Sequence, residues 1–173
     1  MPVNSMTRAA RRAGSVCRGV RRGCERMLVT TKGQYAMRLM IFIARGQGDK
    51  IALRRVAEAE NISLKYLEHL AHSMVKAGLL VSVRGYGGGY LLGKDPSDIR
   101  AGDILRVSEG STAPVNCAGL VDGCPRENVC STVAFWTGLD RVIEEYVDGV
   151  TLAQLADLEP SPISSVYDLV ERR

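Results

Sequence analysis

Three cysteines in an irregular stretch of the chain are the residues best suited to chemistry. Cys117, Cys124 and Cys130 are separated by six and then five residues. Structural zinc sites usually show closer pairs, roughly two to four residues apart. Wider spacing on a loop lets three thiolates converge on a larger object, such as an iron–sulfur cluster. The spacing therefore favours metal or cluster ligation, with reactive thiols or inert cysteines as the alternatives.

The cell compartment is predicted from the cysteines and from hydropathy. Two further cysteines, Cys17 and Cys24, bring the count to five, and no secretory signal precedes the body of the chain. An odd number of cysteines without such a signal favours reduced thiols over a disulfide framework. No apolar run reaches the roughly 18 residues of a membrane span. We therefore expect a cytoplasmic protein with no membrane partner.

The charge is divided unevenly along the chain. The net charge of +4 conceals +6 over residues 1–26, +6 over 27–94 and −8 over 95–173. A basic part followed by an acidic part indicates an anionic partner that is bound by one part only. Only two histidines and few aromatic residues are present, and no pattern typical of an active site appears. We do not expect an enzyme.

The elements that must position these residues are mainly helical. A capping box of Thr31 and Gln34 is expected to start the first helix, and Gly46 to end it in the left-handed conformation. Ser63 is expected to cap a third helix. The predicted helices cover 32–45, 53–59, 64–77, 101–109 and 132–147, with a short one after a second capping box at Thr151 and Gln154; the predicted strands cover 79–84 and 90–92.

Two helices joined by a short turn and followed by a β-hairpin have the order of a winged helix-turn-helix. In that fold the third helix enters the DNA major groove and the hairpin lies beside it. Arg84, just before the glycines of the hairpin, is suited to a narrow minor groove, the alternative being a solvated arginine. The candidate residues on the helix are Ser63, Lys65, Tyr66, Glu68 and His69. Glu68 and Ser63 can read base edges, and Lys65 is suited to phosphate.

The helix at 132–147 has one strongly apolar face, formed by Phe135, Leu139, Val142, Ile143 and Tyr146. A small domain cannot cover this face alone, so we expect it to form a dimer, with ordinary core packing as the alternative. The fold class is therefore mainly α, with a small β-hairpin wing and a long dimerisation helix.

The first 26 residues contain seven arginines and one acid and lack core periodicity. They could form a disordered arm that binds nucleic acid, or a transit peptide. We expect instead that translation begins at Met27. The predicted division is thus an extension over 1–26, a DNA-binding domain over 27–94, a segment with a linker helix, cysteine loop and dimerisation helix over 95–158, and a tail over 159–173.

Residues 27–158 resemble the IscR-like ("Rrf-two" type) family of bacterial winged-helix transcriptional regulators. The segments that carry the resemblance are TTKGQYAMRLM, ISLKYLEHL, KAGLLVSVRGYGGGYLLGKD and CAGLVDGCPRENVCSTVAFW. The resemblance implies a homodimer on double-stranded operator DNA, with Ser63, Tyr66, Glu68, His69 and Arg84 reading bases. It also implies that the three cysteines hold an iron–sulfur cluster, for which we expect [2Fe–2S], with [4Fe–4S] as the alternative.

Three positions depart from the family pattern. Family members with [2Fe–2S] have a histidine three residues after the third cysteine, where this chain has Val133. In nitric-oxide sensors an acid on the partner's first helix completes the site, and Gln34 stands at the place we would align with it. The fourth ligand stays open between Asp122, Glu127, a partner group, a small thiol and a cysteine of the extension. His69 replaces a typical glutamine, which predicts a different operator preference.

The function that we expect is a dimeric DNA-binding repressor that senses iron–sulfur status, redox state or nitric oxide through this cluster. The first alternative is the same DNA-binding protein with a metal-free thiol switch. The second is a winged-helix adaptor that binds protein rather than DNA, for which we expect no sequence-selective footprint and little dependence of affinity on salt.

Overall fold

The computed structural model describes residues 29–115 and 129–158 of the chain. The predicted extension over 1–26 and tail over 159–173 lie outside these residues. Six helices and one hairpin follow in the order α1 (Thr31–Arg45), α2 (Leu53–Glu60), α3 (Leu64–Lys76), β1 (Leu80–Val83), β2 (Gly89–Leu92), α4 (Ala101–Glu109), α5 (Val133–Gly149) and α6 (Leu152–Asp157).

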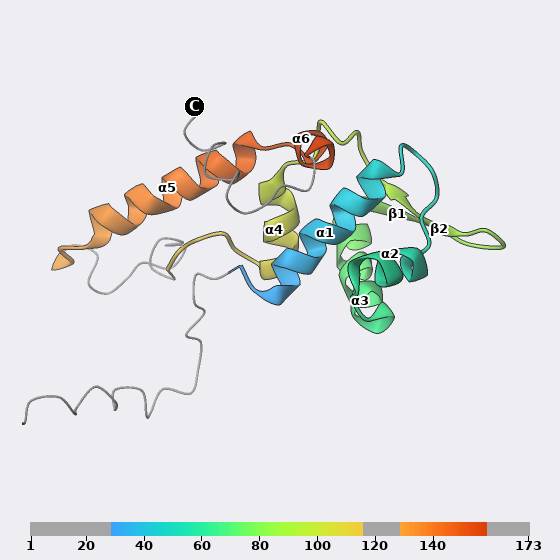
Figure 1. Cartoon of the computed structure of the whole chain (residues 1–173). Helices are drawn as coiled ribbons and strands as arrows, with labels where there is room; N and C mark the ends of the chain where they lie inside the picture. Colours follow the sequence, from blue (N-terminus) through green and yellow to red (C-terminus); the bar gives the residue numbers. More distant parts are fainter. Residues whose placement is uncertain (1–28, 116–128, 159–173) are drawn as a thin grey trace, which may run out of the picture.

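Helix α1 runs through the centre of the helical body, with α2, α3 and the hairpin on one side and α4 and α6 on the other (Figure 1). Its inward face buries Leu39, Met40 and Ile43. Helix α3 places Leu67 and Leu70 in the same core, and α4 contributes Ile104. Each fully buried side chain of this size stabilises the fold by about 1.5–3 kcal/mol.

Strands β1 and β2 form an antiparallel hairpin in which Leu80 pairs with Leu92 and Val83 with Gly89. An isolated bridge ties Tyr90 of β2 to Ile51, which precedes α2. The hairpin projects from the body beyond α2 and α3 (Figure 1). The predicted mainly helical winged helix-turn-helix is confirmed, with helix limits that differ from the prediction by at most two residues.

The predicted start of α1 is wrong in its detail. Thr30, not Thr31, is the N-cap, and its Oγ1 accepts from the backbone N–H of Lys32 at 3.1 Å. The Gln34 side chain donates to the carbonyl of Val29 instead of closing a capping box. A carboxylate from a distant helix fills the role expected of Gln34: Glu109 accepts from the N–H groups of Thr30 and Gly33 at 2.8 and 2.9 Å.

The predicted left-handed stop at Gly46 is also wrong. Gly46 has φ −71°, in the right-handed region, and positive φ values fall on Gln47 and Gly48. A Cβ added at position 46 would lie 2.9 Å from Cδ1 of Ile51, so a larger residue there would displace this side chain. Glycine at position 46 thus suits the close approach of the segment before α2. The other capping box, of Thr151 and Gln154 on α6, is confirmed.

Helix α5 differs from the others in having no buried residue. It extends away from the body and approaches it only near its C-terminal end (Figure 1). The largest exposures on its predicted apolar face are those of Phe135, Val142 and Tyr146, at 64%, 57% and 58%. No helix in the described part of the chain is long and apolar enough to cross a membrane.

The contact between Glu109 and the start of α1 makes a prediction for stability. Glu109→Ala removes the acceptor for two backbone N–H groups and for the Thr30 hydroxyl. We expect a loss of about 1–2 kcal/mol in the free energy of unfolding. Urea denaturation at fixed protein concentration measures it, with Glu58→Ala on the exposed face of α2 as the control. Equal midpoints for the two variants would show that the cap is dispensable.

Candidate nucleic-acid interface and cysteine site

The start of α3 follows from the residues around Ser63. Ser63 is in extended conformation, and its Oγ accepts from the N–H of Tyr66 at 3.3 Å. Asn61 before it adopts the left-handed conformation, with φ 52°, which ends α2 and turns the chain sharply. Ile62 and Leu67 on either side of the cap are both buried. The N-terminal turn of α3 is thus held in place while its outer face stays open.

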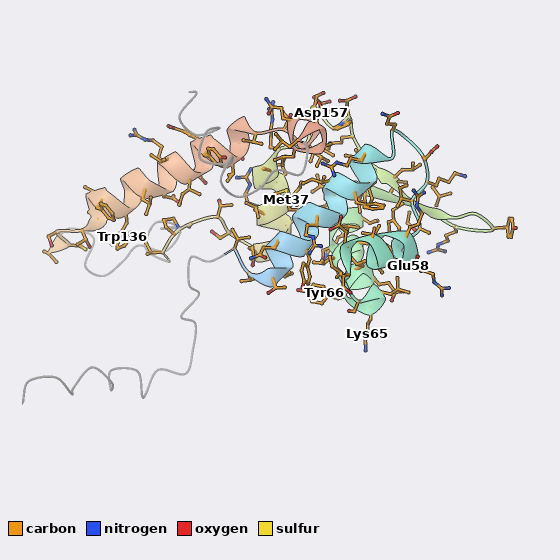
Figure 2. All side chains as sticks on the ribbon, viewed as in Figure 1. Met37, Glu58, Lys65, Tyr66, Trp136 and Asp157 are labelled. Atoms are coloured by element: carbon orange, nitrogen blue, oxygen red, sulfur yellow. The ribbon has the colours of Figure 1, made fainter. Side chains whose placement is uncertain are left out.

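The predicted DNA-contact residues of α3 lie together at this end of the helix. Ser63, Lys65, Glu68 and His69 are exposed, whereas Tyr66 is half-buried. The Lys65 side chain extends away from the body, and Tyr66 lies on the side of α3 that faces α1 (Figure 2). The opposite face of the helix buries Leu67 and Leu70. A polar surface on a firmly packed helix is what a recognition helix requires.

A set of contacts behind α3 holds Tyr66. The Tyr66 ring meets Tyr35 of α1 edge to face, with 5.8 Å between ring centroids. The guanidinium carbon of Arg38 lies 5.6 Å from the centre of the Tyr35 ring. Arg38 also donates to Oε2 and to the backbone carbonyl of Glu60 at 2.7 and 2.6 Å. The partial burial of Tyr66 is therefore against α1.

Arg84 immediately follows β1 and is exposed. The turn after it uses Gly85 at φ 102° and Gly87 at φ 69°, a region that side chains rarely adopt. Tyr86, between these glycines, is fully exposed. The hairpin therefore presents one cation and one aromatic ring close to its tip.

Sequence reasoning did not select two exposed arginines of α2. Arg54 and Arg55 lie in its first turn, which has neither a side-chain cap nor an acidic residue. Positive side chains at the positive end of a helix dipole are unfavourable unless an anion is near. Two adjacent arginines in the first turn of a helix are the sequence signal by which these residues could have been found. They add two positive charges on α2.

Of the three predicted ligand cysteines, the described residues include one. Cys130 is half-buried, three residues before the first residue of α5, and its Sγ lies 3.3 Å from Oγ1 of Thr132. Cys117 and Cys124 lie outside the described residues, so their convergence stays a prediction. Within the residues that are described, no group of three histidine, cysteine or acidic side chains could hold a metal.

The fold and the open face of α3 define a protein that regulates transcription by binding DNA. Residues 29–158 match a family model described as "Iron-dependent Transcriptional regulator", that of the Rrf2 family. The chain belongs to this family of DNA-binding regulators, which is not a family of enzymes. It is 39% identical over 132 residues to the HTH-type transcriptional regulator IscR of Yersinia pseudotuberculosis, a match that covers 76% of this chain and 80% of the relative.

Solved structures show the same fold. CymR, the global cysteine regulator of B. subtilis, is 38% identical with a TM-score of 0.61, over 76% of this chain and 97% of that one. The oxidized form of Staphylococcus aureus CymR is 34% identical with a TM-score of 0.59, over 78% of this chain and 99% of that one. The chain is therefore similar to regulators of both names.

The cap at Ser63 makes a prediction for the stability of the fold. Ser63→Ala removes the acceptor for the Tyr66 N–H and is expected to lower the free energy of unfolding by about 1 kcal/mol. Ser63→Gly, the matched control, is expected to cost only a few tenths of a kcal/mol, because glycine is well tolerated at an N-cap. Thermal and urea unfolding measure both variants. Equal losses, or none in Ser63→Ala, would contradict this account of how α3 begins.

Proposed function

We propose that this protein is a homodimeric repressor that binds operator DNA and senses its signal through an iron–sulfur cluster held by Cys117, Cys124 and Cys130. The observation that carries the proposal is the position of Cys130. Cys130 lies three residues before the first residue of α5, and the segment with all three cysteines joins α4 to α5. A change at these cysteines therefore acts on the connection between the DNA-binding body and the exposed helix.

The donor set fits an iron–sulfur cluster. Three thiolates supply the soft anionic ligands that such clusters require. Cys130 lies three residues before the first residue of α5 and is half-buried. When bound, the cluster would supply an inorganic centre that responds to iron supply, redox state or nitric oxide. We favour [2Fe–2S] over [4Fe–4S], and Val133, which has no donor atom, leaves the fourth ligand open.

The proposed reading of DNA uses the exposed end of α3 and the hairpin. Glu68 and His69 would meet base edges in the major groove, with Ser63 and Tyr66 beside them. Lys65 would contact phosphate, which positions the protein without selecting a sequence. Arg84 would enter the minor groove next to the wing. The net charge of +6 over residues 27–94 supports this assignment.

The proposed dimer uses α5. On its apolar face Phe135, Val142 and Tyr146 are more than half exposed, and among the described residues no side chain of α5 is buried. A second copy of the same helix is the partner that this self-complementary stripe fits. Two copies would place two α3 helices on successive major grooves.

A metal-free thiol switch is the second candidate. The similarity to CymR, a cysteine regulator that was also solved in an oxidized form, favours it. In this candidate the same three cysteines change by oxidation, and the DNA-binding body is unchanged.

Isolation without oxygen separates the two candidates. We expect brown protein with visible charge-transfer absorption and with iron and acid-labile sulfide in equal amounts. Cys130→Ser is expected to lose the absorption, because the cluster loses one of its ligands. The matched control, Ser131→Ala at the exposed position next to Cys130, is expected to keep it. Colourless wild-type protein that forms disulfides reversibly would replace the cluster with the thiol switch.

The wing assignment is tested by Arg84→Ala. Loss of one arginine contact to DNA is expected to cost about 1–3 kcal/mol of binding free energy. Arg141→Ala on α5, an equally large loss of charge at an exposed position, is the control and is expected to bind normally. Fluorescence anisotropy at one fixed salt concentration measures both, with DNA that the wild-type protein selects from a random pool. Normal binding by Arg84→Ala would remove the wing from the interface.

A further inference from the structure

Helix α5 is attached to the body at two points. The first is a backbone connection: Arg100 and Thr151 form an antiparallel bridge, and the N–H of Ala101 donates to the carbonyl of Val150 at 2.9 Å. The N–H of Leu152 donates to the carbonyl of Ile99 in the same place, at 2.8 Å. These bonds determine where α5 ends, but a single point of attachment leaves its direction undetermined.

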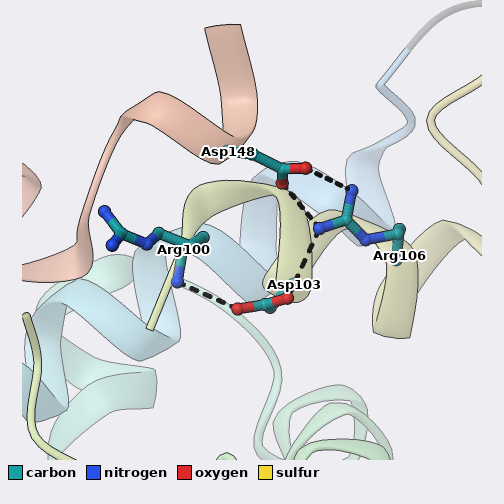
Figure 3. A network of polar contacts seen from close by, with 4 residues as sticks. All are labelled: Arg100, Asp103, Arg106 and Asp148. Carbon is teal, nitrogen blue, oxygen red and sulfur yellow. Dashed lines mark hydrogen bonds and ion pairs between the residues drawn. The ribbon is translucent and has the colours of Figure 1, made fainter. Parts of the chain in front are cut away.

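The second point is an ion pair between α4 and α5. Nη2 and Nη1 of Arg106 donate to Oδ1 and Oδ2 of Asp148 at 2.6 and 3.3 Å (Figure 3). Nη2 also lies 3.4 Å from Asp103, whose other oxygen accepts from the Arg100 N–H at the start of α4. The hydrogen bond that Arg106 donates to Asp148 is the main reason that the pKa of Arg106 is raised above its usual value.

The surroundings of this pair leave it little alternative geometry. A Cβ added to Gly102 would collide with Asp148 and lie 2.8 Å from Nη2 of Arg106, so the bare backbone at position 102 makes room for the pair. Arg106 lies about 7.5 Å further along α4 than Ala101, since a helix rises about 1.5 Å per residue. A backbone attachment and an ion pair at this separation together determine the direction of α5 relative to α4.

Helix α4 in turn is rigidly joined to the DNA-binding body. Ile104 is fully buried against the core that α1 and α3 share. Glu109, its last residue, caps α1 through three hydrogen bonds to Thr30 and Gly33 within 2.9 Å. A rotation of α5 relative to α4 is therefore also a rotation of α5 relative to α3.

Because α5 is long, a small change in the angle between α5 and α4 moves its far end by a large distance. Its 17 residues span about 25 Å. A rotation of about 10° at its base therefore moves its far end by about 4 Å, which is close to the roughly 3.4 Å of one base-pair step. Two bodies joined through two such helices would change their separation by a comparable amount.

From this geometry we infer that Arg106 and Asp148 are positioning residues that set the spacing of operator half-sites. The pair determines the direction of α5, and thereby the distance between the two recognition helices of a dimer. The inference rests on the proposed dimerisation through α5. It adds the residues that select one half-site spacing over its neighbours.

Arg106→Ala and Asp148→Asn test this inference, with Glu145→Gln as the matched control. Glu145 pairs with Arg141 of the same helix at 3.7 Å, and both side chains are largely exposed. The probes are the duplex that wild-type protein selects from a random pool, derivatives with one base pair added or removed between the half-sites, and an isolated half-site. We expect the wild type and Glu145→Gln to show the same preference for one spacing.

In Arg106→Ala and Asp148→Asn we expect this preference to weaken by about two- to fivefold, since a partly exposed bidentate pair can contribute no more than its own modest energy. Affinity for the isolated half-site and the melting temperature are expected to stay at wild-type values. The double variant is expected to lose no more than either single variant, because both remove the same contact.

Three results would overturn the inference. The first is an unchanged spacing preference in both variants. The second is a weaker affinity for the isolated half-site, because the pair would then act on the reading surface itself. The third is a wild type that is monomeric in sedimentation equilibrium, or indifferent to spacing. The third result also refutes the proposed dimeric function, whereas the first two refute only the role of Arg106 and Asp148. The failure of the inference can thus be distinguished from the failure of the proposed function.

Discussion

The burial of α1 between α3 and α4 is the constraint on which the rest of the structure depends. Ala36, Leu39, Met40 and Ile43 exclude water from both of its neighbours at once. Because α3 is held by one apolar face, its other face can consist of polar side chains without loss of rigidity. A recognition helix must be rigid and exposed at the same time, and this packing meets both requirements.

Polar contacts between helix ends determine how the helices around this apolar core are oriented. Arg38 joins α1 to the end of α2, and Glu109 joins α1 to the end of α4. Helix α4 therefore has two functions: its buried face belongs to the body, and its outer face carries Arg106 toward α5. The segment with the proposed ligand cysteines leaves from the end of α4 and returns at the start of α5. In the proposed function, a change there would reach the proposed DNA-reading face of α3 through α4.

Much of the fold could be predicted from local patterns. The cap at Ser63, the left-handed Gly110 after α4 and the capping box on α6 depend on residues within a few positions of each other. Periodicity identified the buried face of α3, including Leu67 and Leu70. The error at Thr31 occurred because a distant carboxylate, that of Glu109, took over the role expected of Gln34. At Gly46 the error was local, since the positive φ values fall on the next two residues, Gln47 and Gly48.

By itself the sequence determined the order of helices and strands, the polar outer face of α3 and the spacing of the cysteines, because short-range hydrogen bonds and helical periodicity depend on neighbouring residues. Only the tertiary structure decided which groups meet across the fold. Glu109 reaches Thr30 over 79 positions, and Arg106 reaches Asp148 over 42. No local pattern encodes such contacts, because they depend on how the buried faces of separate helices pack, and that packing directs α5 away from the body.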